Sequence, residues 1–166
     1  HDNKIPAFSA ITRRVHDLGG RIIMQVAHAG RQTIPSATGG RVYGPTTASS
    51  PYFRSHPEAL DEKGITAIIE DFGRAAERAM KASFDGVELH AAHGYLIHQF
   101  INPAINDRTD AFGIDRGPGI GTEFLRRVIG ASRERCGPAF PLLVKISAGD
   151  EYRNGMSPER FGNLLA

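Results

Sequence analysis

Cysteine is almost absent from this sequence: Cys136 is the only one among 166 residues. A single thiol cannot form a disulfide within the chain. It also cannot supply the several cysteines that an iron–sulfur cluster or a cysteine-based metal site requires. Sites of these kinds are therefore excluded within this segment. Such a low cysteine content is typical of a reducing compartment, so we expect a cytoplasmic location.

Long apolar runs and a strong charge bias are also missing. No stretch approaches the ~20 apolar residues that a membrane-spanning helix needs, and the polar start HDNKIP has no signal-peptide core. The formal net charge is only +2, and the basic residues are scattered along the chain. We therefore expect neither a membrane nor a nucleic acid as a partner. Because the chain begins with His1 instead of Met, we expect it to be part of a longer protein.

The residues that are present alternate between helical and strand patterns. Hydrophobic residues make up 40% of the chain and charged residues 23%, which is enough for a buried core. Apolar residues at spacings of three and four, such as Phe8, Ile11 and Val15, predict helices, whereas short apolar runs between turn residues predict strands. The predicted helices cover residues 6–18, 61–82, 123–135 and 157 onward, and the predicted strands cover residues 22–26, 84–89 and 141–147.

Strands that alternate with helices pair in parallel through right-handed crossovers, so the predicted fold class is α/β. A (β/α)8 TIM barrel needs eight strands and typically ~250 residues, so this chain would supply about three parallel strands of such a barrel. Residues 1–166 are thus interpreted as one partial TIM-barrel domain. Residues 31–57 are rich in Gly, Pro, Ser and Thr without periodicity, which predicts a functional loop over the site.

Three side chains that can donate protons follow the second predicted strand. His90, His93 and Tyr95 lie within six residues of one another. Side chains just beyond the carboxyl ends of parallel strands point into the ligand crevice of α/β folds, so this position favours a functional site. Packing is the alternative for Tyr95, because the amphipathic body of a tyrosine packs readily at a strand end.

Other polar residues have simpler explanations. The His-x-x-His spacing, with His98 nearby, suggests a metal site, but no carboxylate motif or cysteine pair accompanies it, so we expect no metal. A metal-dependent hydrolase on the same barrel is therefore a weaker alternative. Metal that stays bound to the protein after treatment with a chelator would support it. His28 is expected to bond backbone in the turn after its strand. The glycines of residues 117–121 lack the spacing of a phosphate-binding loop and predict a flexible loop.

Two strand positions require partners that the sequence does not identify. Lys145 interrupts an otherwise apolar strand, and an unpaired buried ammonium group is costly, so either a ligand or a carboxylate must compensate its charge. Gln25 interrupts the first predicted strand in the same way. In the loop after residue 102, Arg108 and Asp110 are expected to pair with each other.

Four motifs occur in a fixed order: QVAHAGRQ at residues 25–32, DGVELHAAHGYLIHQF at 85–100, NPAINDRTDAFG at 102–113 and VKIS at 144–147. Together they resemble the old yellow enzyme family of flavin oxidoreductases over essentially the whole chain. The resemblance implies an FMN-binding (β/α)8 barrel, with NADH or NADPH as the source of hydride. This chain would correspond to the third, fourth and fifth strand units of that barrel.

The resemblance also implies a role for each matching residue. Gln25 matches the glutamine that hydrogen-bonds the flavin pyrimidine edge, a task that suits an amide because it offers both a donor and an acceptor. His90 and His93 match the pair that binds the carbonyl or nitro oxygen of the substrate. Tyr95 matches the tyrosine that delivers a proton to the neighbouring carbon. Lys145 matches a basic position near flavin N1, where many members have arginine.

The implied activity is reduction of activated C=C bonds in small α,β-unsaturated carbonyl or nitro compounds. Relatives that oxidise amines or reduce dienoyl thioesters are an alternative within the same class. In this family, further contacts to flavin come from the first, seventh and eighth strand units. We therefore expect this segment alone to hold FMN weakly. A different alternative is an incomplete barrel fragment that self-associates through exposed sheet edges, giving a homo-oligomer.

Overall fold

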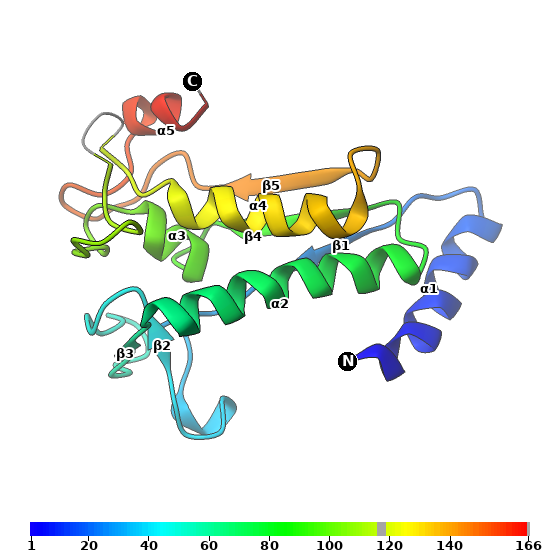
Figure 1. Ribbon diagram of the computed structural model, residues 1–166, viewed down its shortest axis with the longest axis horizontal. Helices are drawn as coiled ribbons and strands as arrows, with labels where there is room; N and C mark the ends of the chain where they lie inside the picture. Colours follow the sequence, from blue (N-terminus) through cyan, green and yellow to red (C-terminus); the bar gives the residue numbers. More distant parts are fainter. Residues whose placement is uncertain (116–118, 166) are drawn as a thin grey trace.

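The computed structural model describes residues 1–115 and 119–165 of the chain (Figure 1). Its main elements, in chain order, are α1 (Ile5–Asp17), β1 (Ile23–Val26), β2 (Tyr43–Gly44), β3 (Glu58–Ala59), α2 (Glu62–Lys81), β4 (Gly86–Ala91), α3 (Leu96–Ile101), α4 (Glu123–Cys136), β5 (Leu142–Ile146) and α5 (Pro158–Leu165), with short 3-10 turns at Asp2–Lys4 and Pro35–Ala37. Every predicted helix and strand is confirmed, with its ends shifted by no more than two residues.

The three predicted strands form one parallel sheet in the order β1-β4-β5, which confirms the α/β fold class. The register places Gln25 of β1 beside Glu88 of β4, and His90 of β4 beside Lys145 of β5. Because the strands are parallel, their carboxyl ends lie along one edge of the sheet. β2 and β3, which lie between β1 and α2 in the sequence, form a separate two-stranded parallel sheet.

The two faces of the sheet differ in what they contact. Val87, Leu89 and Ala91 of β4 are fully buried and belong to the hydrophobic core that includes residues of α2 and α4. These two helices lie together along the same face of the sheet (Figure 1). Side chains alternate along a strand, so Gln25 and Lys145 project from the opposite face, where both are exposed. The polar residues that interrupt the strands are therefore outside the core.

The longest helix, α2, shows how sequence sets the packing. Asp61 caps its amino end by accepting a hydrogen bond from the Gly64 N–H at 2.7 Å, as expected for an N-cap aspartate. Ile65, Ile69 and Phe72 lie on its buried face, in the core described above. Within residues 1–115 and 119–165, no helix combines the length and apolar character needed to cross a membrane.

Helix α3 was not predicted from the sequence. All six of its residues, Leu96–Ile101, are buried, so no alternation of polar and apolar residues marks a helical period. Phe100 of this helix stacks on Phe124 of α4 with ring centroids 4.1 Å apart. Further along, Ser157 Oγ accepts a hydrogen bond from the Arg160 N–H at 3.3 Å and so caps the amino end of α5. The predicted loop at residues 117–121 includes residues 117 and 118, which lie outside the described residues.

Candidate active site

The end of the central strand brings the three predicted site residues together. The ring centroid of His90 lies 5.0 Å from that of His93 and 5.0 Å from that of Tyr95. His90 still belongs to β4, which ends at Ala91, two residues later than the sequence pattern indicates. His90 is 3% exposed, Tyr95 is half-buried and His93 is exposed. The cluster therefore presents one buried ring and two accessible ones.

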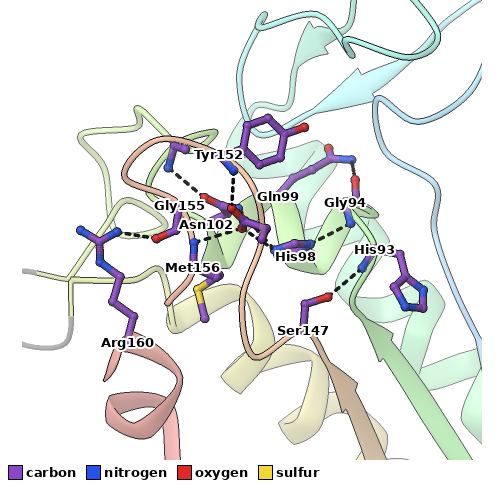
Figure 2. Close-up of polar contacts among 12 residues, drawn as sticks. His93, Gly94, His98, Gln99, Asn102, Ser147, Tyr152, Gly155, Met156 and Arg160 are labelled. Carbon is purple, nitrogen blue, oxygen red and sulfur yellow. Dashed lines mark hydrogen bonds and ion pairs between the residues drawn. The ribbon is translucent and has the colours of Figure 1, made fainter. Parts of the chain in front are cut away.

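An unusual backbone turn sets the directions of these side chains. His93 has φ 58° and Gly94 has φ 76°, both in the left-handed region. This conformation costs a non-glycine residue about 1–2 kcal/mol, so neighbouring contacts must stabilise it at His93. The His93 N–H donates to Ser147 Oγ at 3.2 Å, just after β5 (Figure 2). The turn after β4 is thus tied to the adjacent strand unit.

Glu88 supplies the partner that both Gln25 and Lys145 require. Its Oε1 accepts a hydrogen bond from Gln25 Nε2 at 2.5 Å and lies 3.4 Å from Lys145 Nζ. The carboxylate therefore compensates the lysine charge. The sequence patterns did not identify Glu88 as this partner. The strand period could have indicated it, because Glu88 precedes His90 by two residues and so lies on the same face of the strand.

Burial and nearby charge determine the protonation of His90. Burial lowers its pKa most, His93 and Lys145 lower it further, and Glu88 opposes them. The hydrogen bond from Gln25 lowers the pKa of Glu88, which keeps that carboxylate ionised. His90 Nδ1 is buried and has no hydrogen-bond partner among the described residues. A buried polar atom without a partner costs about 1–3 kcal/mol, which favours a bound group that would satisfy it.

Two simpler predictions from the sequence are confirmed. His28 Nδ1 accepts a hydrogen bond from the Gly30 N–H at 3.0 Å in the turn after β1. Arg108 Nε donates to Asp110 Oδ1 at 3.0 Å, within the loop that follows α3. In the part of the chain that the structure describes, no group of three or more His, Cys, Asp or Glu side chains is arranged to hold a metal ion.

A cleft of about 600 Å³ opens beside His93. The segment of residues 31–57 contributes Gln32 and Tyr52 to its wall, and the segment after β5 contributes Ser147 and Tyr152. The long loop therefore lies next to the polar cluster, where a functional loop was predicted. Side chains from the segments that follow β1, β4 and β5 thus line one cleft, at the edge of the sheet where α/β folds commonly place ligand sites.

Comparison with known proteins identifies the class. The model of the NADH:flavin oxidoreductase / NADH oxidase family matches residues 1–159, so the chain belongs to this family, which includes the old yellow enzymes. FMN, with NADH or NADPH as reductant, is the cofactor set of these oxidoreductases, which confirms what the resemblance implied.

Individual relatives agree with this assignment. The chain is 37% identical to the NADH oxidase of Thermoanaerobacter brockii, over 99% of this chain and 25% of that protein. It is 35% identical to the NADPH dehydrogenase of Listeria welshimeri, over 97% of this chain and 46% of that protein. The chain thus spans less than half the length of these curated relatives.

Solved structures confirm the predicted partial TIM barrel. Morphinone reductase superposes with a TM-score of 0.84 at 28% identity, over 96% of this chain and 46% of that one. The old yellow enzyme homologue from Zymomonas mobilis superposes with a TM-score of 0.84 at 29% identity, over 98% of this chain and 48% of that one. The described strands and helices therefore correspond to part of a larger barrel.

The lowered histidine pKa values predict a loss of stability in mild acid. Burial lowers the pKa of His28, His90 and His98 below the ordinary value of 6.5. As pH falls below 6.5, the unfolded chain binds protons that the folded chain resists, so the free energy of unfolding decreases. The lowered carboxylate pKa values, such as that of Asp85 at about 2, act only at lower pH.

Urea unfolding at several pH values between 7 and 5 measures this loss directly. We expect the midpoint to fall steadily across this range and to fall less steeply in His90→Asn, which removes one of the three groups. A midpoint that stays constant between pH 7 and 5 would show that these histidines titrate alike in the folded and unfolded chain.

Proposed function

We propose that the protein from which this chain comes is an FMN-dependent reductase of activated C=C bonds, driven by NADH or NADPH. Its substrates would be small α,β-unsaturated carbonyl or nitro compounds, and residues 1–166 would form part of its barrel domain. The observation that supports the proposal most is the cluster of His90, His93 and Tyr95 at the carboxyl end of the central strand. The cluster lies beside an exposed strand face that displays Gln25 and Lys145.

The exposed strand face has the donors that a flavin needs. Gln25 offers an amide, which can donate to and accept from the edge of a pyrimidine ring. Lys145 offers a cation that would stabilise negative charge on a reduced ring, and at 44% exposure its side chain is accessible. Both groups are held by Glu88 on the same face. FMN held by Gln25 and Lys145 would supply the redox chemistry, which is the transfer of hydride from NADH or NADPH to the β-carbon of the alkene.

The histidines would bind the activating oxygen of the substrate. The lowered pKa of His90 favours the neutral imidazole, which still has one N–H to donate. His93 is exposed on the neighbouring turn and can add a second donor. Donors aimed at an oxygen where negative charge develops stabilise the transition state, and one such donor is worth about 10²–10³ in rate.

Tyr95 would complete the reaction as the proton donor. Its ring lies edge-on to His90 with the ring centroids 5.0 Å apart, so Tyr95 belongs to the same cluster as the proposed oxygen-binding groups. The half-buried position leaves the side chain accessible from the site while it packs at the start of α3. Protonation of the α-carbon by a positioned acid removes the charge that the two histidines stabilise.

Substitution of Tyr95 tests the proposed chemistry. With FMN and NADPH supplied, we expect Tyr95→Phe to lower kcat for enone reduction by about 10²–10⁴, the usual worth of a general acid, without changing FMN affinity. Tyr43→Phe, at a half-buried tyrosine in β2, is the matched control and should retain the wild-type rate. Equal rates in Tyr95→Phe and wild type would remove Tyr95 from the mechanism. Turnover of amines or dienoyl thioesters, with none of enones, would redirect the proposal to those relatives.

A second candidate concerns this chain expressed by itself. In the described sheet, β1 and β5 each pair with β4 alone, so each has an edge without a strand partner. Ile23 and Leu143 are large apolar residues on the uncovered face, with exposures of 44% and 41%. Unpaired edges and exposed apolar side chains favour association with further strands. We infer that this chain alone self-associates through that face.

Light scattering coupled to size-exclusion chromatography tests this second candidate. We expect a mass of at least twice the 18.0 kDa of one chain at micromolar concentration. Leu143→Lys places a charge on the apolar face and should shift the population toward monomer, whereas Phe53→Lys, at an exposed residue of the long loop, should not. A monomer at all concentrations would refute self-association.

A further inference from the structure

The backbone of Gly94, in the turn between His93 and Tyr95, is bonded at both its N–H and its carbonyl by buried side chains of α3. The Gly94 N–H donates to His98 Nδ1 at 2.7 Å, and the Gly94 carbonyl accepts from Gln99 Nε2 at 2.6 Å (Figure 2). His98 is 3% exposed and Gln99 is 0% exposed. The backbone that connects two proposed site residues is therefore fixed by side chains outside the proposed site.

The hydrogen bond from Gly94 determines the tautomer of His98. A backbone N–H can only donate, so Nδ1 must be the unprotonated nitrogen of the ring. Burial lowers the pKa of His98, with Asp150 opposing and His93 and Arg31 adding to the effect, so the ring is neutral near pH 7. The single ring proton is then on Nε2, which faces Asp150 Oδ2 at 3.5 Å.

Asp150 is itself held firmly in place. Its Oδ2 accepts hydrogen bonds from Asn102 Nδ2 at 2.5 Å and from the Met156 N–H at 3.0 Å. Its Oδ1 accepts from the Tyr152 N–H at 2.9 Å. The Asn102 amide also lies 3.3 Å from His98 Nε2, but in this tautomer both groups are donors, and the Asn102 amide donates to the carboxylate. Asp150 therefore links the segment between β5 and α5 to helix α3.

We propose that His98, oriented by Asp150, is a positioning residue that holds the His93–Tyr95 turn in its left-handed conformation. The His98 ring reaches the Gly94 N–H from α3, and the His93 ring points away from His98 (Figure 2). Without the acceptor at Nδ1, the Gly94 N–H would lose its partner, and the left-handed backbone at His93 would be held less firmly. The relevance of this role for catalysis rests on the proposed function, whereas the role in the turn does not.

The ring tautomer gives a direct spectroscopic test of the proposal. In the ¹⁵N-labelled chain, we expect the nitrogen shifts of His98 to show an unprotonated Nδ1 and a protonated Nε2 at pH 7. A proton on Nδ1 would overturn the proposal, because that nitrogen could not then accept from Gly94. This measurement requires neither flavin nor substrate.

Amide hydrogen exchange at Gly94 then tests whether His98 holds the turn. We expect His98→Leu to speed this exchange about tenfold, the effect of one hydrogen bond. His98→Asn should restore protection, because its amide oxygen takes the place of Nδ1, and Asp150→Asn should give a smaller increase than His98→Leu. His56→Leu, at an exposed histidine of the long loop, is the matched control and should leave Gly94 unchanged.

The outcomes separate this proposal from the proposed function. Unchanged Gly94 exchange in folded His98→Leu overturns the positioning role. If His98→Leu does not fold, unprotected Gly94 in His98→Asn overturns it equally. Restored protection in His98→Asn, with kcat/KM for enone reduction lowered in His98→Leu and recovered in His98→Asn, supports both proposals. Absence of enone reduction in the wild type would count against the proposed function alone, since hydrogen exchange and ring shifts still decide the role of His98.

Discussion

Burial of one face of β4 is the constraint on which the rest of this structure depends. Val87, Leu89 and Ala91 are fully buried against the helices, which forces the alternate residues to the opposite face. Glu88 and His90 are those alternate residues, and parallel pairing aligns them with Gln25 and Lys145. A hydrophobic requirement on one face thus arranges the polar chemistry on the other.

Glu88 interacts with both proposed cofactor contacts, Gln25 through a hydrogen bond and Lys145 through an ion pair. One carboxylate oxygen lies within 3.4 Å of the ammonium of Lys145 and accepts the amide hydrogen of Gln25. An ionised Glu88 also raises the pKa of His90, although burial dominates and the net direction is downward. Glu88 therefore holds the two side chains that we propose to contact flavin, and it partly offsets the lowering of the pKa of His90, which we propose to contact substrate.

Local sequence patterns predicted the sheet and its long helices because each follows a simple rule. α2 has an apolar face of helical period, and β4 lies between turn residues, so both were found with small shifts at their ends. Helix α3 was missed because burial on all sides leaves no period to detect. Glu88 and Asp150 were missed because their partners are distant in sequence, 63 and 48 residues away for Gln25 and Asn102. The strand period alone places Glu88 on the same face as His90, but only the pairing of the strands shows that Gln25 and Lys145 are its partners.

Titration of the purified chain with FMN, followed by the flavin absorption band, tests the central claim most directly. That claim is that the strand face with Gln25 and Lys145 binds flavin. The account predicts saturable, weak binding that Lys145→Ala weakens about tenfold, the effect of one charge-assisted hydrogen bond. Lys63→Ala, at an exposed lysine of α2, should bind as the wild type does. Absent binding, or binding that Lys145→Ala leaves unchanged, would contradict the claim.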